Sequence, residues 1–199
     1  MRRTFVQAEA LDFLPTYLNE LKYMAADKNA SQMRQFQNVL IQDGKRLTRS
    51  EFLELATPID NRYNVDYLAT EYNTTVAQAT RIRDWNDFDK PLLRYRTVND
   101  ANVRHEHQAM NGVTLPKDDP FWETYAPLNG WNCRCYLQEL DRAKISDTDD
   151  LDFEEIDTQV PKEFRNNPAV SGTLWKGGNV YRSEITEKQK QSVEKLVNG

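Results

Sequence analysis

The longest stretch of this chain without glycine or proline runs from Ile59 to Lys90. Within it, five apolar residues are spaced by 3, 4, 4 and 3 positions: Val65, Leu68, Tyr72, Val76 and Ala79. This spacing places their side chains along one face of an α-helix. The stretch therefore predicts one long amphipathic helix, and the flanking elements must supply the surface against which that helix packs.

Shorter helices are predicted on the N-terminal side of this stretch. An apolar stripe with helical spacing is interrupted by Pro15 and then resumes. Its members are Phe5, Ala8, Leu11 and Leu14 before the proline, and Leu18, Leu21 and Ala25 after it. Ser31 is a candidate N-cap of another helix, which would end near Gly44. Thr48 to Glu51 has the form of a capping box, so a further helix begins there and is expected to end at Thr57-Pro58.

Beyond Lys90 the pattern changes to short β-branched and aromatic segments. Residues 92–98 and 134–140 are predicted strands, and residues 99–136 are rich in turn signals such as Asn111-Gly112. A polar helix is expected over residues 183–197. The predicted class is α+β: N-terminal helices and one long amphipathic helix, then a small loop-rich β portion and a C-terminal helix. The expected regions are 1–58 (helical), 59–140 (core), 141–159 (acidic linker) and 160–199 (extension packing on the core).

The charge of the chain is concentrated in one segment. The 199 residues include 26 Lys and Arg against 31 Asp and Glu, a net charge of −5. Eight acidic residues and only two basic ones lie between Asp141 and Asp157. Such a run is typical of a solvated linker, with a metal-binding or basic-partner patch as the alternative. No stretch approaches 18 consecutive apolar residues, so no membrane-spanning helix is predicted.

The two histidines and two cysteines of the chain lie near one another in sequence: His105, His107, Cys133 and Cys135. On extended backbone, both members of each pair would point to the same face. Thiolates and imidazoles are good tetrahedral zinc ligands, so a structural metal is one interpretation. Buried core cysteines with hydrogen-bonded histidines are another, and a Cys–His nucleophilic pair is a third. A Cys133–Cys135 disulfide is not expected, because its short loop would be strained.

Other signals of catalysis or nucleic-acid binding are weak. The sequence has no phosphate-binding loop, dinucleotide fingerprint, H-E-x-x-H or nucleophile elbow. Four arginines near Trp85 and Tyr95 could contact nucleic-acid phosphates, namely Arg81, Arg83, Arg94 and Arg96. Nearby aspartates instead favour a salt-bridged, solvent-facing surface.

Several motifs follow one another in a specific order between Leu68 and Leu140. After a helix containing Thr70-Glu71-Tyr72 and a strand, the pattern D-x-x-V-R-x-x-H-x-x-x-x-G occurs at Asp100, Val103, Arg104, His107 and Gly112. D-D-P-F-W and P-x-N-G-W-x-C-R-C then contain Phe121, Trp122, Pro127, Asn129, Gly130, Trp131, Cys133, Arg134 and Cys135. In this order and spacing the chain resembles the phage Mu protein F-like domain of minor head, or head morphogenesis, proteins of tailed phages and prophages.

The resemblance implies a structural or assembly protein present in few copies at the portal vertex, inside the head of the virion, and made in the bacterial cytoplasm. Portal and capsid proteins are the implied partners, with packaged DNA as a further candidate and no membrane. It also implies that His107, rather than His105, is the family histidine, which would join Cys133 and Cys135 around one structural zinc. Many relatives are longer, so a fragment or a compact version without a fused toxin is expected.

The residues of the motif also predict particular local contacts. Asp100 and Arg104 are expected to pair across a turn, with Arg104 also holding loop carbonyls. Gly112 after Asn111 suits a tight turn with positive φ. Large aromatic residues are expected to supply most of the core of this region, namely Phe121, Trp122 and Trp131. A metal at His107, Cys133 and Cys135 would tie the loop ends together.

Two competing functions remain open from the sequence. A metal-dependent hydrolase or phage-delivered effector would need an open metal position and a nearby general base, for which Glu106 or Asp100 is the candidate. An adaptor module would dock its helix over residues 59–90 into a partner, and exposed apolar residues on that helix would support this interpretation.

Overall fold

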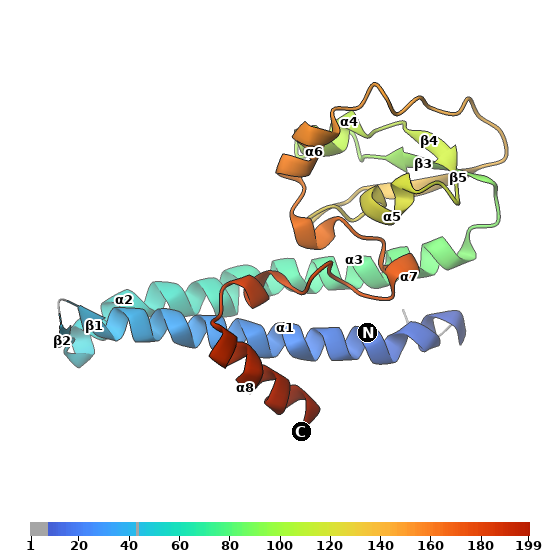
Figure 1. The fold of residues 1–199 in the computed structure, drawn as a ribbon. Coiled ribbons are helices and arrows are strands. Elements are labelled where there is room, and N and C mark those ends of the chain that lie inside the picture. Colours follow the sequence, from blue (N-terminus) through green and yellow to red (C-terminus); the bar gives the residue numbers. More distant parts are fainter. Residues whose placement is uncertain (1–7, 43) are drawn as a thin grey trace. The chain divides into compact units, whose positions relative to one another are not determined.

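The computed structural model of the protein describes residues 8–42 and 44–199, with side chains described from residue 13 onward (Figure 1). The chain divides into two compact units. The first comprises Asn73–Gly177 together with Met1–Thr16, and the second comprises Tyr17–Tyr72 together with Gly178–Gly199. The α+β class predicted from the sequence is confirmed, because long helices precede a small antiparallel sheet and a C-terminal helix follows it.

Helix α1 (Ala8–Leu40) is one continuous helix with Pro15 inside it. The predicted break at Pro15 and the predicted new helix capped by Ser31 are therefore wrong. Tyr17, two residues after the proline, is buried, and its packing offsets the loss of the one backbone hydrogen bond that proline deletes. Ser31 is instead buried in mid-helix, with its hydroxyl 2.7 Å from that of Tyr63. Phe5 lies outside the described residues, as do the side chains of Ala8 and Leu11.

Helix α2 (Arg49–Asn61) begins with the predicted capping box. The Thr48 backbone N–H donates to the Glu51 carboxylate at 2.8 Å, and the Thr48 hydroxyl oxygen accepts from the Glu51 N–H at 3.4 Å. The predicted stop at Thr57-Pro58 is wrong, because α2 continues through Pro58. Burial of Ala56 and Tyr63 on either side of the proline keeps this segment helical.

The segment predicted as a long helix from Ile59 to Lys90 is helical as far as Asp87, but the helical run begins earlier than predicted, at Arg49. It consists of the end of α2, a π-helical turn η1 (Arg62–Asp66) and helix α3 (Tyr67–Asp87). The residues of its predicted apolar stripe differ in burial. Val65 and Leu68 are exposed, whereas Ala79 is buried. The segment is therefore amphipathic, but only the C-terminal part of the stripe is covered by the rest of the chain.

The first unit is built on a three-stranded antiparallel sheet in the order β4-β3-β5. Its strands are β3 (Leu92–Arg96), β4 (Thr114–Pro116) and β5 (Tyr136–Leu140). In Figure 1, β3 lies between the other two, and Arg94 is paired with Thr114 on one side and Gln138 on the other. The predicted strands over 92–98 and 134–140 are confirmed, whereas β4 lies in a region expected to be loop.

The core of the first unit lies against the buried face of this sheet. Leu93 and Tyr95 alternate with partly exposed residues along β3, as a half-buried strand requires. Phe121 and Trp122 of helix α5 (Phe121–Tyr125) are buried in the same cluster, and Trp131 packs against it. Phe121 and Trp122 are therefore core residues, as predicted, but the prediction that the three aromatic residues supply most of the core is wrong, because Trp131 is only partly buried and residues of β3, β4 and α6 contribute to the same cluster.

The first unit also contains the short helical elements α4 (His105–Ala109), α6 (Phe153–Gln159), η2 (Lys162–Phe164) and α7 (Pro168–Ser171). The segment predicted as an acidic linker contains α6, whose N-cap Asp152 accepts a hydrogen bond from the Glu155 N–H at 2.8 Å. Earlier in this segment, Ser146 exchanges two hydrogen bonds with the backbone of Thr114, each of 2.9 Å. The bonds of Ser146 to β4 and the burial of Ile156 in the core cluster therefore attach the acidic segment to the first unit.

The second unit is a helical hairpin. Its two arms are α1 from Tyr17 onward and α2–η1–α3 as far as Tyr72, joined through the two-residue strands β1 (Ile41–Gln42) and β2 (Lys45–Arg46). A C-terminal segment with η3 (Val180–Ser183) and α8 (Glu187–Asn198) packs on this hairpin. Buried polar contacts hold this segment in place. The carboxylate of Asp27 in α1 accepts hydrogen bonds from Asn179 at 2.9 Å and from Arg182 at 3.2 Å.

No helix within the described residues has both the length and the apolar character needed to cross a membrane.

Candidate metal centre

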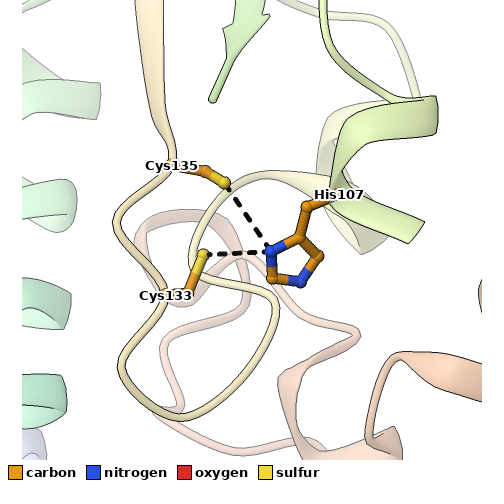
Figure 2. Close-up of side chains that lie close together, drawn as sticks. All are labelled: His107, Cys133 and Cys135. Carbon is orange, nitrogen blue, oxygen red and sulfur yellow. Dashed lines mark hydrogen bonds between the residues drawn. The ribbon is translucent and has the colours of Figure 1, made fainter. Parts of the chain in front are cut away.

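Three potential metal ligands converge in the first unit. His107 projects from α4, and Cys133 and Cys135 lie on the loop that leads into β5 (Figure 2). The imidazole Nδ1 is 3.7 Å from each of the two Sγ atoms. All three side chains are buried, with exposed fractions of 2%, 6% and 3% respectively. The structure therefore brings together the set that the sequence pattern and the resemblance had singled out.

His105 does not join this group. It lies on the helix α4 rather than on extended backbone, so its side chain points away from that of His107. Its Nδ1 is 3.6 Å from the Glu155 carboxylate, and the side chain is largely exposed. The expectation that the two histidines share a face is wrong, whereas Cys133 and Cys135 both turn their sulfurs toward His107.

The loop that carries the cysteines is held by hydrogen bonds from elsewhere in the first unit. Arg81 of α3 donates to the Cys135 carbonyl at 3.2 Å. The Asn132 backbone N–H donates to the Thr74 hydroxyl at 3.0 Å, and Asn132 has a positive φ of 55°. Asparagine tolerates this left-handed conformation better than most residues. These contacts fix the backbone that presents the two sulfurs.

The imidazole of His107 is oriented by a second layer of contacts. Its Nε2 is 3.3 Å from the Asn129 carbonyl oxygen, and a proton on Nε2 would leave Nδ1 available to a metal. Asn129 in turn accepts a 2.9 Å hydrogen bond from the Tyr95 hydroxyl through its side-chain oxygen. Tyr95 was not among the site residues predicted from the sequence, although the alternation along β3 places it on the buried face.

The pKa values of the two thiols are shifted in opposite directions. A hydrogen bond from Cys135 holds the pKa of Cys133 well below its usual range. The same hydrogen bond, together with burial, raises the pKa of Cys135. Cys133 is thus the sulfur that carries negative charge first, and thiolate is the form that binds metal.

The geometry of the three donors fits a tetrahedral zinc ion. Zinc–sulfur bonds of about 2.3 Å and zinc–nitrogen bonds of about 2.05 Å at the tetrahedral angle place nitrogen and sulfur about 3.6 Å apart. The observed nitrogen–sulfur separations of 3.7 Å agree with this value. Among the described residues no fourth histidine, cysteine or carboxylate joins the cluster. The residues present therefore supply three of the four ligands that zinc takes.

A cavity of about 630 Å³ adjoins the cluster. The three ligand side chains and the buried Thr74 form part of its lining, and exposed polar residues form much of the rest. These polar residues are Asn73, Asn102, Arg104, Asn132 and Arg134. None of the described residues that line this cavity is acidic.

The two general-base candidates of the sequence analysis lie elsewhere. The Glu106 carboxylate is 3.7 Å from His107 Nε2, on the ring edge opposite the sulfurs. Asp100 forms a bidentate ion pair with Arg134, with distances of 2.5 and 2.7 Å. This pair lowers the pKa of Asp100. The predicted ion pair between Asp100 and Arg104 is therefore wrong. The actual partner, Arg134, lies 34 positions from Asp100 in sequence and is brought beside it by folding.

The remaining motif residues shape the backbone around the cluster. Arg104 donates to the Trp131 carbonyl at 2.6 Å, as predicted. A Cβ at Gly130 would lie 3.2 Å from Arg104 Nη1, so glycine allows this close approach. Gly112 has the predicted positive φ, at 95°. Pro127 is buried with the core residues.

Three of the four arginines considered for nucleic-acid binding contact other side chains of the first unit. Arg81 and Arg83 both pair with Asp84, at 2.8 and 2.9 Å. Arg94 donates to the Thr114 hydroxyl at 2.7 Å. These contacts favour the salt-bridged surface over a phosphate-binding patch.

Comparison with known proteins gives a consistent result. A family model described as "Phage Mu protein F like protein" matches residues 25–138, more than half of the chain. "Putative capsid assembly protein F" of Escherichia phage Mu is 33% identical over 99 residues, which cover 48% of this chain and 21% of that protein. "Mu-like prophage FluMu F protein" of Haemophilus influenzae is 36% identical over 89 residues, covering 39% of this chain and 22% of that protein. The matched region thus spans about a fifth of each relative. No solved structure matches the chain.

Proposed function

The chain belongs to the phage Mu protein F-like family, and from this premise we propose that it acts in head morphogenesis, as a capsid assembly protein of a tailed phage or prophage. Its place is the portal vertex inside the head of the virion, in few copies. Its partners are portal or capsid proteins. The name of the phage Mu relative, which refers to capsid assembly, supports this proposal.

One observation favours an assembly role over catalysis: the polar residues of the family motif are used to hold the fold together. Asp100 is paired with Arg134, and Arg104 is bonded to the Trp131 carbonyl. The described lining of the adjoining cavity contains no carboxylate that could act as a general base. The motif therefore builds a rigid element, as a component of a shell requires.

A single structural zinc is part of the proposal. His107, Cys133 and Cys135 would hold it, and it would tie α4 to the loop before β5. A bound zinc at such a site contributes directly to the free energy of folding. The zinc would therefore stabilise the part of the protein in which the family motif lies.

The second unit supplies a surface suited to a protein partner. Val65 and Leu68, three positions apart on consecutive helical turns, have exposed fractions of 62% and 57%. The adaptor interpretation required exposed apolar residues on this helix. Their exposure supports a role in which the helix docks onto another head protein.

The proposed function is tested by deleting the gene from its phage and complementing it in trans. We expect heads from the deletion to be defective and infectious titre to fall, with recovery upon complementation. Quantitative mass spectrometry of purified heads should find the protein at a small fraction of the major capsid protein, and crosslinking should connect it to the portal or capsid protein. Normal titre without the gene, or absence of the protein from heads at every assembly stage, would refute the proposal.

A further inference from the structure

The cavity beside the His107–Cys133–Cys135 cluster has the composition of an anion site. Its described lining offers the guanidinium groups of Arg104 and Arg134, three asparagine side chains and the Thr74 hydroxyl, and no acidic group. Arg104 uses one N–H on the Trp131 carbonyl. Since a guanidinium has five N–H donors, others remain to face a ligand.

The charges around the cavity indicate the class of anion. Two thiolates would neutralise a zinc ion, and the ion pair with Asp100 neutralises Arg134. Arg104 then leaves the loaded site with one positive charge. A carboxylate, with one negative charge, balances it, whereas the inorganic phosphate dianion would leave the site with a net negative charge.

The position of the three ligands also leaves room for an external donor. The cavity touches all three ligand side chains, and no fourth ligand lies among the described residues. The ring of His107 is fixed from the other side by Asn129. Carboxylate oxygen is also a zinc ligand, at a distance of about 2.0–2.2 Å.

We propose that this cavity binds a carboxylate group, which takes the fourth position of the metal held by His107, Cys133 and Cys135 and is hydrogen-bonded by Arg104. The inference rests on the proposed metal site, and it identifies what that site recognises. The carboxylate is carried either by a small molecule or by an acidic side chain of a partner protein. In the second case the metal site is a docking point for assembly.

The test uses cobalt(II) in place of zinc, because its visible absorption reports ligand identity and coordination number. The cobalt-loaded protein is titrated with acetate, with a short peptide containing one glutamate, with the same peptide containing glutamine, and with inorganic phosphate; both peptides carry blocked termini. We expect acetate and the glutamate peptide to shift the cobalt bands saturably and the glutamine peptide to leave them unchanged. Tighter binding of the glutamate peptide than of acetate would identify a protein partner as the source, and equal binding would identify a small carboxylate.

Variants separate the role of Arg104 from a general effect of charge. Arg104→Gln should weaken acetate binding by roughly tenfold or more, since it removes a charge-assisted hydrogen bond. Arg94→Gln is the matched control, because Arg94 bonds to Thr114 and is not part of the cavity lining. The cobalt spectrum without added anion shows whether each variant still forms the site. Arg104→Lys, which keeps the charge, should retain part of the affinity.

Three outcomes would overturn the inference. Cobalt bands that no anion shifts would mean that the fourth position is closed, although the metal site itself would stand. A shift by phosphate at lower concentration than acetate would assign the cavity to phosphate, including that of nucleic acid. Failure of cobalt to bind would remove both the carboxylate site and the proposed zinc, while leaving the head-assembly role to its own genetic test.

Discussion

Removal of zinc is expected to destabilise the first unit, and the size of the effect follows from the positions of the ligands. His107 and Cys133 are 26 positions apart, so the metal closes a loop of that length. Treated as a cross-link, such a closure contributes about 3.5 kcal/mol by restricting the unfolded chain. For a unit of this size, that free energy corresponds to a shift in Tm of roughly 10–15 °C.

The assay is differential scanning calorimetry of the zinc-loaded protein, with and without a chelator, together with metal analysis. His107→Ala and Cys133→Ser should melt at the lower temperature in both conditions and contain no zinc. His105→Ala is the matched control, because that histidine is exposed and lies outside the cluster; it should behave as wild type. Wild-type protein that holds one zinc per chain but melts at the same temperature with chelator would refute the reasoning, as would equal loss in the His105 variant.

Other substitutions test separate parts of the argument. Trp122→Ala should cost about 3–5 kcal/mol in urea unfolding, because it empties a fully buried site; a loss below about 1 kcal/mol would contradict its place in the core. Thr48→Ala should cost about 1 kcal/mol by removing the N-cap of α2, whereas unchanged stability would contradict the capping box. Asp100→Asn should lower stability at neutral pH, and the difference from wild type should shrink as pH falls below about 4. The pKa of Asp100 is lowered in the fold, so its contribution exists above the unfolded pKa and is lost as pH falls; a pH-independent difference would exclude this cause. Leu68→Asp, at an exposed site, should leave Tm unchanged yet reduce phage titre in complementation, and full titre would count against docking through α3.

Part of the candidate site could be predicted from the sequence. The spacing of Cys133 and Cys135 indicated two sulfurs on one face, and the resemblance selected His107 over His105. The cavity could not be predicted, because its lining comes from four parts of the chain: α3, the loop after β3, α4 and the cysteine loop. For the same reason the partner of Asp100 was predicted as the nearby Arg104, whereas folding brings Arg134 to it.

The sequence by itself determined the features that depend on neighbouring residues: the capping box at Thr48, the helix beyond Ile59, the strand at Leu92 and the turn at Gly112. Each depends on hydrogen bonds or side-chain spacing within a few positions, so local patterns are sufficient. Only the tertiary structure decided that α1 runs through Pro15 and α2 through Pro58, because burial against distant residues offsets the local cost of proline. It also decided that residues 114–116 form β4, since a three-residue strand ending in proline is stable only when β3 lies beside it.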